Sequence, residues 1–376
     1  MYVLPKCGEF ITGVCHPGNE VALIKSASIG WSREDIPFPF ERGTESTLTP
    51  RYIKFRDRVK RFSEAGIKSM CITPYPRAFV QYGVDPSTKE GLEVVKRICT
   101  FLATDLGPLG AAGFQITNEL NVFHFRVPLS LEQAPDFIIA GLQGVNAGYP
   151  EAILGYNIAG ISETVLALIS AIEPYHGIVD YMGLDSYKGT WSDGEPEDIL
   201  AEVDATYEAT KLPVVLQEFG FSSVGEIFTE TDVSRYLNDL GFSGVADVFA
   251  DPLSMIKRMP YQLATRVLES PEEDWAVNCL GFMPHLLRKW PGGSRKYRHT
   301  VEGQAAFYNE LMSRLLEHPH IAGTIIFSWK DAEVCFNCSY PNCPCETGWG
   351  ITDSAEKPKP AYYVIKEHFQ AIGAGC

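Results

Sequence analysis

The chain has 376 residues and a formal net charge of −15, and its sequence pI is near 5.0. Hydrophobic residues make up 45% of the chain and charged residues 21%, a composition typical of a globular protein with a large buried core. The acidic balance argues against nucleic acid and anionic membranes as partners, whereas a neutral substrate such as a sugar stays open.

Short β-branched or apolar runs alternate with amphipathic stretches along the chain. The runs predict eight strands, at residues 11–15, 28–36, 67–73, 113–117, 153–157, 179–185, 214–217 and 324–328. Helical spacing of apolar residues predicts helices that include 52–65, 92–106, 163–172, 301–317 and 360–372. Strand–helix alternation repeated eight times predicts a (β/α)₈ barrel, so we expect residues 1–376 to form one domain.

One connection is much longer than the others. Residues 221–300, between the seventh strand and the helix after it, exceed the usual length of such a loop and contain helical patches, as at 251–269. Loops that follow barrel strands lie on the catalytic face, so this insertion is expected to cover that face and shape a substrate site. An interface or a packing decoration is the alternative.

Two glutamates stand at predicted strand ends. Glu119 follows the fourth strand, and Glu218 follows the seventh. These strands lie on opposite sides of a barrel mouth, so the two carboxyl groups can face each other across a sugar. Hydrolysis with retention uses two carboxyl groups about 5–5.5 Å apart, one that attacks and one that donates a proton. The alternative is two surface glutamates that cap the following helices.

This arrangement resembles clan A of the glycoside hydrolases, a large group of (β/α)₈ retaining glycosidases, over nearly the whole chain. That clan carries Asn-Glu at the end of strand four and a nucleophilic glutamate at the end of strand seven. The resemblance implies that Asn118 binds the sugar 2-hydroxyl, Glu119 is the acid/base and Glu218 is the nucleophile. It indicates no family within the clan: Leu120 stands where several families have proline, and the insertion has no recognised counterpart.

An arginine at the end of strand two often hydrogen-bonds the nucleophile in this clan, and Arg33 stands at that position. A guanidinium group there would keep the attacking carboxylate ionised. Arg33 could instead pair with Glu34 or Asp35, and Arg77, after the third strand, is the competing candidate.

Aromatic residues follow several predicted strands. By the resemblance, Tyr187 after strand six donates to the nucleophile, and Trp329 after strand eight forms the floor of the sugar subsite. Packing at the barrel rim is the alternative for Tyr187, and core packing is the alternative for Trp329. Four other aromatic residues near the rim could line a subsite or serve only packing: Tyr75, His124, Trp191 and Trp290.

Ten cysteines are present, of which six are scattered. The other four are Cys335, Cys338, Cys343 and Cys345, with the spacing C-x₂-C-x₄-C-x-C. Four thiolates in one short loop match a tetrahedral structural zinc site. Two local disulfides or free thiols are the alternatives. Because most cysteines are scattered and no signal peptide is visible, we expect a cytoplasmic protein that does not associate with membranes.

The expected function is a retaining β-glycosidase, exo-acting on small glycosides or oligosaccharides, that needs no cofactor for catalysis. Glu218 would attack the anomeric carbon while Glu119 protonates the leaving oxygen, and Glu119 would then activate water. The alternatives are an endo-acting β-glucanase or β-mannanase and a non-catalytic carbohydrate-binding barrel. A metal-dependent hydrolase is less favoured, because no His-x-His stands at a strand end. The sequence does not indicate an oligomeric state.

Overall fold

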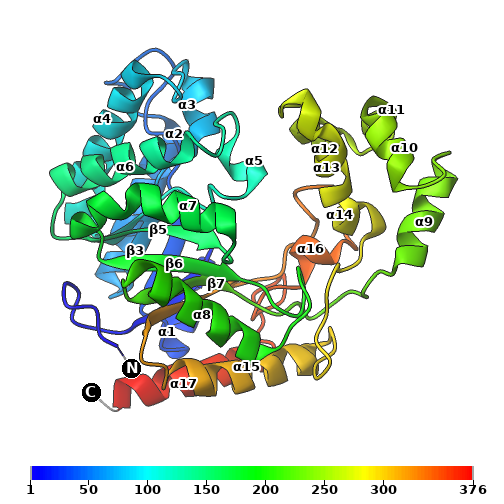
Figure 1. Cartoon of the computed structure of the whole chain (residues 1–376). Helices are drawn as coiled ribbons and strands as arrows, with labels where there is room; N and C mark the ends of the chain where they lie inside the picture. The colour runs from blue at the N-terminus through cyan, green and yellow to red at the C-terminus, as the bar shows by residue number, and fades with distance from the viewer. Residues whose placement is uncertain (1, 375–376) are drawn as a thin grey trace.

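A computed structural model describes residues 2–374, which form a closed barrel of eight parallel strands in chain order (Figure 1). The strands are β1 (Ile11–Cys15), β2 (Trp31–Asp35), β3 (Lys68–Ile72), β4 (Ala111–Ile116), β5 (Ile153–Ala159), β6 (Tyr181–Ser186), β7 (Val214–Phe219) and β8 (Ile321–Ile326). Each overlaps a predicted strand, so the (β/α)₈ barrel is confirmed. The largest shift is in β8, which begins and ends earlier than the sequence indicates.

Helices surround the barrel on its outer side (Figure 1). They are α1 (Val21–Ser26), α2 (Pro50–Glu64), α3 (Pro76–Tyr82), α4 (Lys89–Leu106), α5 (Phe123–Arg126), α6 (Ala134–Gly148), α7 (Glu163–Ile172), α8 (Pro196–Thr210), α15 (Val301–Leu315) and α17 (Pro360–Ala374). Two 3₁₀ helices, η1 (Gly107–Leu109) and η2 (Glu173–Ile178), follow α4 and α7. Among residues 2–374, no helix combines the length and the apolar character that crossing a membrane requires.

The long insertion after the seventh strand is confirmed. It contains α9 (Glu230–Asp239), α10 (Val245–Ala250), α11 (Pro252–Ile256), α12 (Tyr261–Leu268), η3 (Glu272–Asp274), α13 (Trp275–Gly281) and α14 (Met283–Leu287). Figure 1 shows these helices beside the barrel, with α16 (Pro344–Thr347) at the junction. They enclose a hydrophobic core of their own, which also takes in Trp349 and the cysteine loop after β8. The insertion is therefore a second packed unit.

Side-chain alternation along the strands divides the barrel interior into two layers. The lower layer is apolar and contains Ile11, Trp31, Met70, Ile153, Tyr181, Val215 and Ile325. Because alternate residues of a strand point to the same side, the inward residues nearer the carboxyl ends lie above this layer. Arg33, Gln115, Asn157 and Asp185 are among those residues, so the fold itself gathers polar groups at one end of the barrel.

Close packing of α6 on α4 gives a test of the outer core. Gly144 of α6 lies so near α4 that a Cβ atom added there would come 2.4 Å from the carbonyl oxygen of Lys96. We therefore expect Gly144→Ala to lower the free energy of unfolding by about 1–3 kcal/mol, because the helices must separate. Gly281→Ala in α13 is the control, because its Cβ would meet nothing within 4 Å. Urea denaturation of both variants checks this, and equal stability would contradict the close packing.

Candidate active site

Four polar side chains occupy inward positions at the carboxyl ends of the strands: Arg33 on β2, Gln115 on β4, Asn157 on β5 and Asp185 on β6. Arg33 lies two residues after the inward-facing Trp31, so it points inward as well. On β5 and β6, Asn157 and Asp185 likewise lie an even number of residues after inward-facing Ile153 and Tyr181. All four are at most 3% exposed. Buried polar groups need partners, so these residues are expected to bond one another and whatever enters the barrel mouth.

The guanidinium group of Arg33 is the centre of this layer. Its Nη1 donates to Oε1 of Glu218 at 2.5 Å, its Nε to Oε1 of Gln115 at 2.7 Å and its Nη2 to Oδ1 of Asn118 at 2.6 Å. Arg33 is fully buried. The structure thus places Arg33 against Glu218. Arg77, the competing candidate, forms an ion pair with Glu269 of the insertion.

Glu218 reaches the interior through an irregularity in β7. Leu184 of β6 pairs with Leu216, but the next residue, Asp185, pairs with Glu218, so β7 carries one extra residue there. Such a bulge re-aims the side chains that follow it. Glu218 therefore points inward beside Asp185, and the hydroxyl of Tyr187 donates to its Oε2.

Glu119 is held by an unusual backbone segment after β4. Thr117 and Glu119 have φ angles of 53° and 47°, in the left-handed region that costs a residue with a side chain about 1–3 kcal/mol. Hydrogen bonds fix the segment: the N–H of Thr117 donates to Oγ1 of Thr73 at 3.0 Å, and the N–H of Glu119 donates to Oδ1 of Asn157 at 2.8 Å. The strain and its restraints orient Glu119 toward the barrel axis.

Three carboxyl groups meet at this point. Glu119, Asp185 and Glu218 each offer an oxygen atom within 4.8 Å of the others. Burial and the charge of Glu218 raise the pKa of Glu119 to about 8, and the same causes raise the pKa of Asp185 well above its usual range. The shared environment therefore favours the neutral forms of Glu119 and Asp185, whereas Glu218 lies against the Arg33 guanidinium.

These three carboxyl groups could also ligate a cation. The Arg33 guanidinium already supplies a positive charge to Glu218, and the Asn157 Nδ2 donates to Asp185 Oδ2 at 2.6 Å. Two of the three carboxyl groups are thus engaged by protein donors. This arrangement favours acid/base and nucleophilic roles over metal binding.

Trp329 corrects a sequence prediction. Its exposed fraction is 0%, and its indole Nε1 donates to Glu356 at 2.9 Å, away from the carboxyl groups. Because β8 ends at Ile326, Phe327 stands at the strand end where Trp329 was expected. Phe327 is half-buried and lies edge-on to Tyr187, with ring centroids 5.8 Å apart. Trp329 is core packing, and Phe327 packs against Tyr187, whose hydroxyl donates to Glu218.

The four rim aromatics have different surroundings. The Tyr75 hydroxyl donates to Asp35 at 2.9 Å, and the ring stacks on Phe125. Burial, with a smaller contribution from nearby positive groups, lowers the pKa of His124 to about 4. Trp191 is exposed, whereas Trp290 is fully buried in the insertion core. Trp290 therefore cannot line a subsite.

Sequence reasoning did not find several residues of the site. Gln115, Asn157 and Asp185 each follow apolar strand residues, so a polar residue at a strand end was the available signal. Burial, with smaller contributions from the charges of Cys335 and Glu218, raises the pKa of Glu346 of α16 well above its usual range. No local pattern around Glu346 indicates this proximity.

The cysteine loop forms a group whose fourth member is a histidine. Cys335, Cys338 and Cys343 lie with His285 of α14, and the candidate ligand atoms all fall within 4.8 Å of one another. Cys345 is buried nearby but is outside this group. The residues placed to hold a structural metal are therefore three cysteines and His285, which differs from the four cysteines expected from spacing.

Solved structures that are similar to this chain include several glycoside hydrolases. An exo-β-1,4-mannosidase from Opitutaceae bacterium strain TAV5 is 12% identical, with a TM-score of 0.61 over 100% of this chain and 63% of that chain. The GH53 catalytic domain from Ignisphaera aggregans is 14% identical, with a TM-score of 0.59 over 97% and 98% of the two chains. A GH2 β-galacturonidase from Eisenbergiella tayi is 14% identical, with a TM-score of 0.54 over 97% and 51%.

This chain therefore spans about half the length of that galacturonidase. No protein-family model matches the chain, and no curated protein matches it. At such low identity the similarity shows the fold alone: a (β/α)₈ barrel of the kind that these glycoside hydrolases have. The fold that the resemblance to clan A implies is thus confirmed, and no family is indicated.

The raised pKa of Glu119 predicts an alkaline limit to activity. If Glu119 is the general acid, kcat/KM for a β-glycoside with a poor leaving group falls as the pH rises through about 8, because Glu119 loses its proton. A dinitrophenyl glycoside is the control, because its leaving group needs little protonation and its profile stays flatter. Identical profiles for both substrates would argue against Glu119 as the acid. Initial rates across the pH range measure both.

Proposed function

We propose that the protein hydrolyses β-glycosidic bonds with retention of anomeric configuration. The observation that carries this proposal is the separation of Glu119 and Glu218, whose nearest carboxyl oxygens lie within 4.8 Å at the carboxyl ends of β4 and β7. Retaining enzymes hold these groups about 5–5.5 Å apart, whereas inverting enzymes leave about 6.5–9.5 Å for a water molecule. The short separation supports direct attack by a carboxylate.

In the first step Glu218 attacks the anomeric carbon, and Glu119 gives its proton to the leaving oxygen. The two glutamates have different environments, which suits different roles. Arg33 and Tyr187 hold Glu218 as an oriented anion, whereas burial and the charge of Glu218 keep Glu119 protonated. The bond from the anomeric carbon to Glu218 forms as the bond to the leaving oxygen breaks.

In the second step Glu119 acts as a base. Once Glu218 is esterified its negative charge is gone, so the main electrostatic cause of the raised pKa of Glu119 is removed. Glu119, having lost its proton to the leaving group, can then take a proton from water. That water attacks the anomeric carbon, releases the sugar and restores the Glu218 carboxylate.

We also propose exo-action on small glycosides or oligosaccharides. The core of the insertion contacts Tyr187, which donates to Glu218, and Phe327, which packs edge-on to Tyr187. The ion pair between Arg77 and Glu269 joins the rim at α3 to the insertion at α12. A wall on this side would close one end of a cleft and favour a chain end over an internal bond. The similar mannosidase is named as exo-acting, which is consistent with this choice.

A panel of aryl β-glycosides with different sugars tests the proposal, and ¹H NMR identifies the first anomer released. We expect hydrolysis of at least one substrate with the β-anomer appearing first. An α-anomer as the first product would exclude retention. Sugar binding without hydrolysis across the panel would favour a non-catalytic carbohydrate-binding barrel, and activity on long polysaccharides alone would favour endo-action.

Replacing the attacking carboxylate gives a sharper test of roles. We expect Glu218→Gly to lower kcat by roughly 10⁴-fold or more, and azide to restore part of the turnover by giving an α-glycosyl azide. Azide occupies the space of the missing carboxylate and attacks the same face of the sugar. Glu226→Gly, at an exposed glutamate of the insertion, is the control and should keep wild-type activity. Near-normal activity of Glu218→Gly would remove Glu218 from the nucleophile role.

A further inference from the structure

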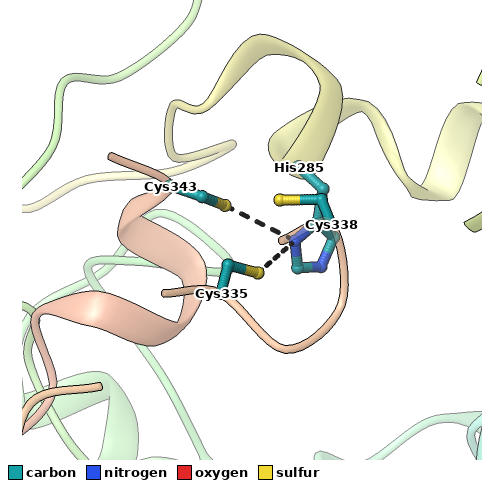
Figure 2. A group of neighbouring side chains, drawn as sticks. All are labelled: His285, Cys335, Cys338 and Cys343. Atoms are coloured by element: carbon teal, nitrogen blue, oxygen red, sulfur yellow. Dashed lines mark hydrogen bonds between the residues drawn. The ribbon is translucent and has the colours of Figure 1, made fainter. Parts of the chain in front are cut away.

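A compact group of buried side chains joins the insertion to the loop after β8. His285 comes from α14, whereas Cys335, Cys338 and Cys343 come from the loop that leads into α16. All four are at most 4% exposed. Figure 2 shows the imidazole ring among the three sulfur atoms, with dashed contacts from Nδ1 to the sulfurs of Cys335 and Cys343.

The distances match a shared metal ion. The Sγ atoms of Cys335 and Cys343 each lie 3.6 Å from Nδ1 of His285. A tetrahedral zinc ion with Zn–S of about 2.3 Å and Zn–N of about 2.0–2.1 Å separates sulfur and nitrogen by about 3.6 Å. Hydrogen bonding explains the pair less well, because one imidazole nitrogen offers either a single lone pair or a single proton.

We propose that His285, Cys335, Cys338 and Cys343 bind one structural zinc ion. Cys345 is not a ligand in this arrangement, because its thiol lies outside the group. The nine cysteines that the structure describes are free, so it contains no disulfide that competes for these sulfurs.

The zinc ion would fasten two segments that are far apart in sequence. His285 precedes Cys335 by 50 residues, and the two belong to one hydrophobic core with Trp349. The ring of Trp349 lies 5.0 Å from that of Tyr187, which donates to Glu218. The site therefore holds the insertion against the rim of the candidate active site. The inference stands on the ligand geometry and does not depend on the proposed hydrolase activity.

Metal content of protein purified without added metal tests the ligand set. We expect about one zinc per chain in the wild type by elemental analysis, and a loss to below about a tenth in His285→Ala and Cys338→Ser. Cys345→Ser and Cys279→Ser are matched controls at buried cysteines of the same core, and both should keep their zinc. Zinc lost in Cys345→Ser but kept in His285→Ala would overturn the ligand set. Wild-type protein without zinc, with these cysteines as disulfides or free thiols, would overturn the site.

Wild-type protein provides a second test in case a variant fails to fold. Exchange of zinc for Co²⁺ should give thiolate-to-cobalt charge-transfer absorption and the d–d bands of a tetrahedral ion. Removing the metal with a chelator should raise hydrogen–deuterium exchange in residues 230–287 and 331–349, while strands β2 to β6 keep their protection. Octahedral cobalt bands, or unchanged exchange in the insertion after zinc removal, would contradict a fastening site.

Discussion

The buried guanidinium group of Arg33 is the constraint on which the candidate active site depends. Removing such a cation from water costs several kcal/mol, so it must be offset by charge and by well-placed acceptors. Arg33 obtains these from Glu218 on β7, Gln115 on β4, Asn118 after β4 and the sulfur of Cys15 on β1. Those partners come together only when the barrel closes, so the orientation of Glu218 depends on barrel closure.

The same ion pair separates the roles of the carboxyl groups. With Arg33 beside Glu218, the cation stabilises one carboxylate, and burial works against charge on the other two. Glu119 and Asp185 consequently have raised pKa values, so they tend to keep their protons while they lie close to Glu218. Two glutamates of identical chemistry thereby acquire the different states that a proton donor and a nucleophile need.

Local sequence patterns predicted the barrel and placed Glu119 and Glu218 at strand ends, because a buried parallel strand has a clear apolar signal. Arg33 was proposed from the resemblance to clan A, and the structure brings it against Glu218. Local patterns failed where side-chain direction depends on irregular backbone. Strict alternation from Val215 would turn Glu218 outward, and only the bulge in β7 brings it inside. Likewise, because β8 ends at Ile326, the aromatic residue directly after the strand is Phe327 and not Trp329.

The histidine of the cysteine group shows a different limit of sequence reasoning. Spacing within the loop pointed to Cys345 as the fourth sulfur, since four cysteines within eleven residues can close a cage unaided. His285 carries no local signal, because it enters the group through tertiary folding of the insertion. Ligands that come from both the insertion and the loop after β8 can be recognised only when the three-dimensional positions of both segments are known.

The candidate active site therefore rests on two separate sources of stability. The Arg33–Glu218 pair belongs to the barrel, whose strands pack on both faces. The rim beside Tyr187 belongs to an insertion of short helices, such as the five-residue α11 and α14, which would not be stable alone in water. Its core is small, so metal binding at the junction would contribute a large share of its folding free energy. With the proposed metal bound, the insertion would be ordered where Trp349 packs on Tyr187, whereas the Arg33–Glu218 pair would be held by the barrel alone.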